Sequence, residues 1–192
     1  MQSCEKNHER QAVFMVAFHE ASHAVVAHEF GIQIELITLG FEDGSNARAE
    51  TNGLYDWIDG PTPSQSDARG LRIWRRKVRR TLTSVVAGYY GNWMLNQERV
   101  RISDLTTDAT IERWSCQEVL SRDEMGKMND YRLAINCAIQ FEGPPINSIR
   151  RAEQRAHRIL RVRWQRVTAI AKKLEKRIPI RGHALDAILR SR

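Results

Sequence analysis

The sequence feature that most constrains this chain is the segment Phe18–Ala27, FHEASHAVVA, which contains the pattern His-Glu-x-x-His. On an α-helix, residues four apart lie on one face. His19 and His23 can therefore direct two imidazole nitrogens at one metal ion. Glu20 lies one step round the helix, where it can take a proton from water and hand it to a leaving amine. The pattern predicts a zinc-hydrolase site, and the alternative interpretation is a pair of satisfied core histidines.

Residues around the pattern indicate that its helix is buried. Small and apolar side chains surround the two histidines, and Gly31 stands where a helix would end. We therefore expect a helix over residues 9–30. A buried helix suits the ligands of a catalytic metal, because such a site works best away from bulk water.

Length and composition favour one domain over residues 1–192, with a metal-site part at 1–148 and basic C-terminal helices at 149–192 packed on it. We expect no membrane span, because no run of eighteen apolar residues occurs. The N-terminus is polar, unlike a signal peptide. The cysteines, Cys4, Cys116 and Cys137, are odd in number and widely spaced, which indicates a reducing cytoplasmic location and idle thiols.

The positive charge lies at the C-terminal end. Residues 150–192 hold fourteen Lys/Arg against three Asp/Glu, whereas the whole chain carries +7. A basic segment can attract nucleic acid, an anionic membrane surface or an acidic partner. Aromatic residues are not interleaved with the basic ones, as a base-stacking surface would need. We therefore favour a solvated helix face over a nucleic-acid-binding surface.

The remaining pattern predicts a mainly α fold with a small β element. A strand is expected at 32–39, followed by a Gly- and Pro-rich hairpin or loop region with a second strand near 51–58. Helices are expected from Ser64–Ser66 through Val78, then as a core segment at 82–94, from Ser103 or Asp104 through Leu120, at 128–139, at 149–174 and at 184–189.

A catalytic zinc site needs a third protein ligand. His28 lies on the far side of the helix from His19 and cannot reach the same metal. Glu42 and Glu50 are candidates, but both lie in the Gly-rich region rather than on a helix. Asp104, at the start of an expected helix, is the better candidate.

At this point the chain resembles the peptidase domain of FtsH-type ATP-dependent zinc metalloproteases. That family carries His-Glu-Ala-Gly-His-Ala, against HEASHA at 19–24 here. Its Asn-Asp-Leu-x-x-Ala-Thr segment, which supplies the third ligand, resembles SDLTTDAT at 103–110. Its Gly-Arg-Ala-Ala-Glu segment resembles GYYGN at 88–92, and its last helices resemble 156–174 followed by 180–182.

The resemblance implies a zincin-like helical fold and a zinc metalloendopeptidase that cuts peptides or unfolded segments. His19, His23 and Asp104 would bind Zn²⁺ and Glu20 would be the general base. The aspartate segment holds one extra residue, so Asp108 is the reserve ligand. Strand residues 34–39 could align an extended substrate by edge pairing.

The family also implies partners. Its protease domains form six-fold rings, which implies a homo-oligomer. No Gly-x-x-x-x-Gly-Lys-Ser/Thr loop occurs in the sequence, so we expect a stand-alone peptidase domain, with any ATPase on a separate chain.

Two departures from the family pattern support an alternative. Ser22 replaces a glycine where the family packs helices closely, and Asn92 replaces a glutamate. The first alternative is therefore a non-catalytic relative that acts as an adaptor or regulator. The second is a nucleic-acid-binding protein that uses the basic segments 72–80 and 150–177.

Overall fold

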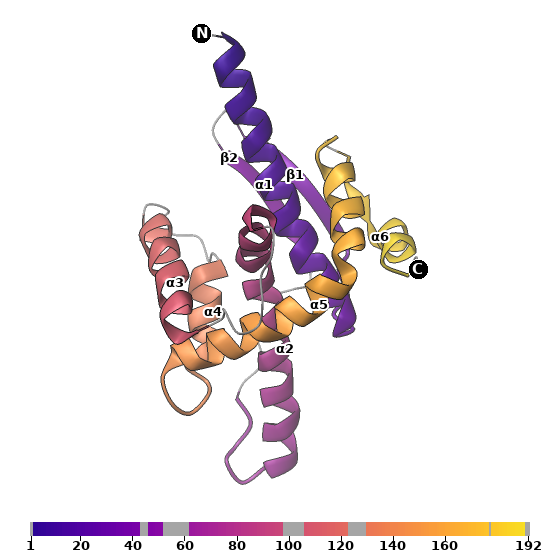
Figure 1. Cartoon of the computed structure of the whole chain (residues 1–192). Helices are drawn as coiled ribbons and strands as arrows, with labels where there is room; N and C mark the ends of the chain where they lie inside the picture. Colours follow the sequence, from indigo (N-terminus) through magenta and orange to yellow (C-terminus); the bar gives the residue numbers. More distant parts are fainter. Residues whose placement is uncertain are drawn as a thin grey trace.

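The computed structural model describes residues 2–42, 46–51, 62–97, 106–122, 130–176 and 178–190. These residues form six helices and three short strands (Figure 1): α1 (Gln2–Glu29), β1 (Leu36–Glu42), β2 (Asn46–Thr51), α2 (Ala68–Asn96), α3 (Thr107–Arg122), α4 (Asp130–Ala138), α5 (Pro145–Leu174), β3 (Ile180–Arg181) and α6 (Gly182–Arg190). The predicted mainly helical architecture with a small β element is confirmed. None of the helices described is long and apolar enough to cross a bilayer.

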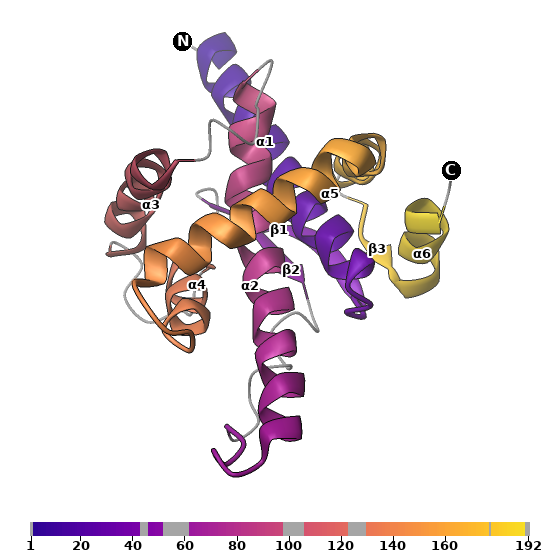
Figure 2. The same ribbon diagram turned by 60° about the horizontal axis from the view of Figure 1, so that its bottom comes forward.

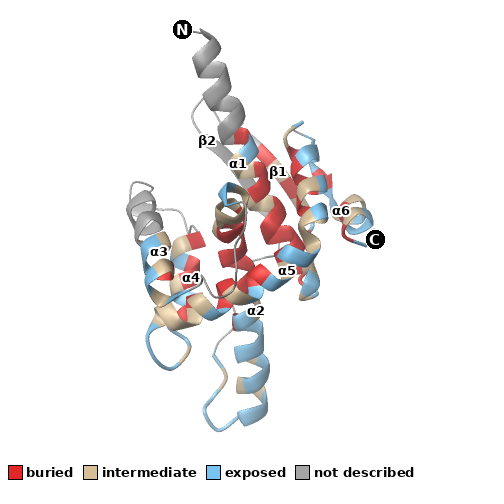
Figure 3. Ribbon diagram, viewed as in Figure 1, coloured by how far each residue is buried: buried red, intermediate tan, exposed pale blue. Residues whose placement is uncertain are grey.

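Three long helices, α1, α2 and α5, make the core. Each contacts the other two, and α5 runs across both α1 and α2 (Figure 2). Buried residues gather where the three helices cross (Figure 3), including the small side chains Ala21 and Ala24 on α1 and the consecutive Val85, Val86 and Ala87 on α2. Small residues allow the helix axes to approach closely. The predicted burial of the motif helix is confirmed: Ser22 and His23 are buried, and His19 and Glu20 are half-buried.

Helix α2 is one continuous helix, where the sequence suggested two consecutive segments. Its N-cap is Asp67, whose carboxylate accepts a hydrogen bond from the backbone nitrogen of Gly70 at 2.8 Å. The capping residue therefore lies just after the predicted start at Ser64–Ser66. The first turns of α2 are largely exposed, and burial begins at Val78 (Figure 3).

The strands form one antiparallel sheet in the order β2-β1-β3. The predicted first strand is displaced, because β1 starts at Leu36 rather than at residue 32. The second strand ends at Thr51, and the expected continuation over 52–58 lies outside the described residues. β1 is the middle strand: β3 pairs with Leu36 and Ile37 and β2 pairs from Ile37 onward. β2 therefore occupies one edge of β1, and β3 occupies part of the other edge. A substrate strand could pair with residues 34–39 only where β3 leaves that second edge free.

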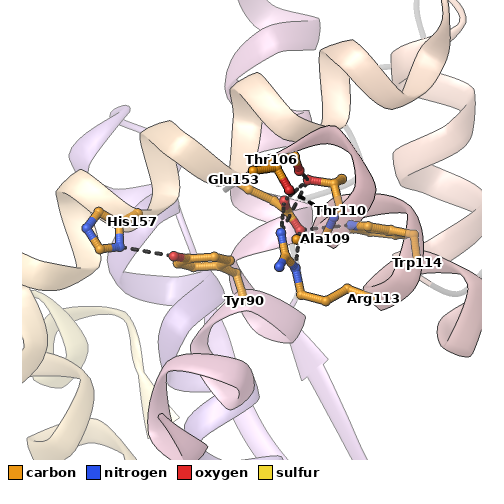
Figure 4. Close-up of polar contacts among 8 residues, drawn as sticks. All are labelled: Tyr90, Thr106, Ala109, Thr110, Arg113, Trp114, Glu153 and His157. Carbon is orange, nitrogen blue, oxygen red and sulfur yellow. Dashed lines mark hydrogen bonds and ion pairs between the residues drawn. The ribbon is translucent and has the colours of Figure 1, made fainter. Parts of the chain in front are cut away.

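A buried carboxylate joins α3 to α5 (Figure 4). Glu153 on α5 is 2% exposed and accepts hydrogen bonds from Thr110 Oγ1 at 2.8 Å and Trp114 Nε1 at 3.0 Å. Arg113 donates to it through Nε at 3.1 Å and a terminal nitrogen at 2.6 Å, and its guanidinium lies 4.5 Å from the centroid of the Trp93 ring. A buried charge needs such pairing, so this cluster fixes α3 against the core.

Candidate metal centre

The two histidines of the sequence pattern converge on one point. They lie one turn apart on the buried face of α1, and their Nε2 atoms are 3.0 Å apart. The side chain of His23 is 3% exposed and that of His19 is 14% exposed. The helix therefore presents both imidazoles inward with one edge of the pair open toward solvent.

A carboxylate from a distant helix completes the cluster. Oδ2 of Asp130, the first residue of α4, lies 2.8 Å from Nε2 of His19 and 2.9 Å from Nε2 of His23. Asp130 is more than a hundred residues from either histidine along the chain. Two nitrogens and one oxygen thus come together through the tertiary fold.

The backbone of α2 sets the tautomer of His23. Nδ1 of His23 lies 2.7 Å from the carbonyl oxygen of Ser84. A carbonyl oxygen only accepts, so Nδ1 carries the proton and donates it. Nε2 is then the nitrogen that can act as a metal ligand, and the Ser84 bond orients the ring in the way that outer-shell partners orient metal-binding histidines.

Without a metal, the cluster holds a proton at His23. Burial disfavours the charged imidazole, but the Asp130 carboxylate more than offsets this and raises the pKa of His23 to about 9. Burial likewise disfavours ionised Asp130, and the two imidazoles overcome it and hold the pKa of that carboxyl well below its usual range. The Asp130 carboxylate therefore favours a positive charge beside the two imidazoles.

The backbone of helix α2 lies very close to the two imidazoles at Gly88. A Cβ atom placed on Gly88 would lie 2.6 Å from Nε2 of His19 and from Cε1 of His23, and closer still to Nε2 of His23. Only glycine leaves this space open. The space adjoins the nitrogen atoms that face Asp130, so the helix packing preserves room at the ligand atoms.

A row of aromatic rings links the four helices that surround the cluster. His19 contacts Tyr89 at a centroid distance of 4.8 Å, Tyr89 contacts Trp114 at 5.7 Å, and Trp114 contacts Tyr131 at 5.8 Å. These residues come from α1, α2, α3 and α4 in turn. Tyr131 follows Asp130 directly, so the ring contacts place the carboxylate against the histidines.

The donor set and its spacing fit a zinc ion. Zinc binds imidazole nitrogen and carboxylate oxygen at about 2.0–2.2 Å, so tetrahedral ligand atoms lie about 3.3 Å apart. The separations among the three donor atoms are 2.8, 2.9 and 3.0 Å. A shift of a few tenths of an ångström would turn this cluster into a zinc tripod.

Glu20 lies beside this cluster, as the sequence predicted. A ligand atom of Glu20 lies within 4.8 Å of those of His19 and His23, and the residue is half-buried. Its negative charge also favours the protonated form of His23. The position suits a general base that stands next to a metal without being required to bind it.

The structure treats the two predicted aspartates differently. Asp104 lies outside the described residues, so its assignment as a ligand stays a prediction. Asp108 lies in the first turn of α3, where it is exposed to solvent. The expected helix start at Ser103 or Asp104 also falls on undescribed residues, and α3 begins at Thr107.

Asp130 was not among the predicted metal ligands, although a sequence pattern around it resembles the family's third-ligand segment. The segment 129–134 reads NDYRLA, in which Asn, Asp and Ala stand at the same spacing as in the family's Asn-Asp-Leu-x-x-Ala. The segment at 103–110, which led to the prediction of Asp104, has one more residue between Asp104 and Ala109 than the family pattern has between its aspartate and alanine. The spacing within residues 129–134 therefore makes Asp130 a second candidate for the third ligand beside Asp104.

Ser22, which stands where the family pattern has a glycine, lies against a glycine of α2. Ser22 is buried and its hydroxyl donates to the carbonyl oxygen of Phe18 at 2.7 Å. A Cβ on Gly91 would lie 2.7 Å from Cβ of Ser22 and closer still to its Oγ. Gly91 aligns with an alanine in the family's Gly-Arg-Ala-Ala-Glu segment. The extra atoms on α1 therefore occupy space that a smaller residue on α2 leaves open.

Comparison of the sequence with protein-family models and with curated proteins gives no match. The class of the protein is therefore described from its fold and its site alone. It is a mainly helical protein with a His-His-Asp cluster and an adjacent glutamate at the crossing of its core helices.

Proposed function

We propose that this protein is a zinc-dependent endopeptidase with a zincin-like fold of the FtsH-peptidase type. The observation that carries the proposal is the convergence of two imidazole nitrogens from α1 and one carboxylate oxygen from α4 on a single point. In this proposal, His19, His23 and Asp130 hold the metal, and Asp104 is the alternative third ligand on sequence grounds.

Zinc, when bound, would polarise the scissile carbonyl and acidify water. Glu20 would hold the attacking water, accept its proton, and then deliver that proton to the departing amine. The hydrogen bond from His23 Nδ1 to the Ser84 carbonyl orients the imidazole so that Nε2 would be the nitrogen available to hold the metal. The partly open edge at His19 gives a substrate access to the cluster.

A fluorescence-quenched unfolded polypeptide tests the proposal. We expect the wild type to cleave it with zinc present and to lose activity in chelator. Glu20→Gln should keep about one zinc per chain and cleave about 10²–10⁴-fold more slowly, since proton transfer contributes that much. Equal cleavage by wild type and Glu20→Gln would refute the assigned base.

One observation favours a non-catalytic adaptor as the second candidate. Asn92 stands where the family has a glutamate, and its Oδ1 atom is buried without a hydrogen-bond partner among the described residues. A protein that binds zinc at this cluster but cleaves no unfolded substrate, and whose biological activity survives Glu20→Gln, would establish this alternative.

A further inference from the structure

A second concave site lies away from the His-His-Asp cluster, on the side where α2 meets the start of α5. It is a surface hollow of about 410 Å³. Leu82 and Ala152, both buried, contribute apolar surface to its lining. Four arginines also line it: Arg75 and Arg79 from α2, and Arg151 and Arg155 from α5.

The arginines are arranged so that each helix contributes a pair. Residues four apart lie on one face of a helix, so each pair of arginines lies on the helix face that lines the site. Like charges at this spacing repel each other and destabilise a helix. Burial and then the neighbouring guanidinium groups of Arg79, Arg158 and Arg151 lower the pKa of Arg155. The fold thus holds positive charges together against their repulsion.

Among the described residues, carboxylates leave most of the positive charge of this site unpaired. The one acidic lining residue, Glu142, has a side chain that is 97% exposed and reaches Arg75 only at 4.0 Å. Within the described part of the chain, no carboxylate oxygen lies within 4.0 Å of a guanidinium nitrogen of Arg79, Arg151 or Arg155. Three guanidinium groups therefore remain available to an external anion.

Two further residues favour a defined binding site over a diffuse charged face. The Arg79 guanidinium stacks over the Phe141 ring, 5.3 Å from its centroid, which restrains where that cation points. Ser148 adds a hydroxyl to the lining. Cations, a hydroxyl donor and an apolar wall together form the kind of lining found in small-molecule sites.

We propose that this cavity binds a small ligand that carries two or more phosphate groups. Guanidinium groups bind phosphate oxygens in pairs of parallel hydrogen bonds, and cations from two helices can engage two phosphates at once. A volume of about 410 Å³ lies within the roughly 300–1,000 Å³ of small-molecule pockets. A nucleic-acid strand offers the same phosphate chemistry, but a stacking surface needs several aromatic rings, and Phe141 is the one aromatic residue among the described residues that line this site.

Calorimetric titration of the full chain with inorganic tripolyphosphate tests this proposal. Zinc is omitted because tripolyphosphate chelates it, so the result does not depend on the proposed metal site. We expect saturable binding of one tripolyphosphate per chain. Arg79→Gln and Arg155→Gln should each weaken it at least tenfold, and Glu142→Gln should strengthen it.

Arg161→Gln is the matched control, because Arg161 is an exposed arginine of α5 outside the cavity. It removes the same charge and should change the affinity less than twofold. Absence of saturable binding, or an equal loss in Arg161→Gln, would overturn the proposal. So would tighter binding of single-stranded oligonucleotides that increases with their length and resists competition by tripolyphosphate, because that result indicates a nucleic-acid interface.

Discussion

Gly88→Ala is the smallest change that tests the geometry of the histidine pair. In a helix interior this substitution normally stabilises by about 0.5–1 kcal/mol, because alanine restricts the unfolded chain. At Gly88 the added Cβ would lie 2.6 Å from Nε2 of His19, well inside the 3.4 Å at which ordinary van der Waals contact begins. The backbone or the imidazoles must therefore move by close to ~1 Å, a displacement that disables catalytic sites.

The expected magnitude combines two opposed effects. Overpacking of a filled core costs about 1–3 kcal/mol, so after the helix-propensity gain of about 0.5–1 kcal/mol the net loss of stability is about 0–2.5 kcal/mol. A shift of ~1 Å is half the length of a zinc–nitrogen bond of about 2.0–2.1 Å. We therefore expect zinc affinity to fall by at least about 100-fold, measured by competition with a chromophoric chelator, with stability followed by urea unfolding.

Gly182→Ala provides the control. Gly182 begins α6, and a Cβ there would meet no atom within 4 Å. This variant should keep wild-type zinc affinity and stability within about 0.5 kcal/mol. If Gly88→Ala bound zinc as tightly as the wild type, the described proximity of α2 to the two imidazoles could not be correct.

Helix packing, the buried Glu153 and the protonation of His23 each allow a further test. Ser22→Gly and Gly91→Ala should each destabilise by about 1–2 kcal/mol, whereas the double variant should recover most of the loss; additive losses in urea unfolding would contradict the complementary packing. Glu153→Gln should cost about 3–5 kcal/mol because it leaves the Arg113 cation without its counter-charge, and a loss under about 1 kcal/mol would refute that role. Zinc must displace a proton from His23, whose pKa is about 9, so zinc affinity should rise about tenfold per pH unit from 6 to 8; calorimetry that shows no dependence on pH would contradict this.

The sequence patterns correctly predicted those features that depend only on residue spacing along a helix. The four-residue spacing of His19 and His23 is sufficient to put both imidazoles on one helix face. The recurrence of apolar residues at three- and four-residue steps likewise gave α5, which extends over Pro145–Leu174 against a predicted 149–174. In both cases neighbours along the helix carry the whole signal.

Features that depend on tertiary contacts were harder to predict. Ile180–Arg181 is too short to show a strand pattern, and it exists as β3 because it pairs with Leu36 and Ile37. The aspartate at the cluster comes from α4, far along the chain, so helix spacing around the histidines could not identify it. Only the spacing within residues 129–134 pointed to it.

Metal content per chain in the wild type and three aspartate variants tests the central claim most directly. We predict about one zinc in the wild type, none in Asp130→Ala, and about one in Asp108→Ala and Asp104→Ala, with folding confirmed by circular dichroism. Asp130 contacts both histidines, whereas exposed Asp108 provides a matched loss of charge. Zinc retained in Asp130→Ala but lost in Asp104→Ala would contradict the assignment of Asp130, and a wild type without zinc at neutral pH would contradict the metal site itself.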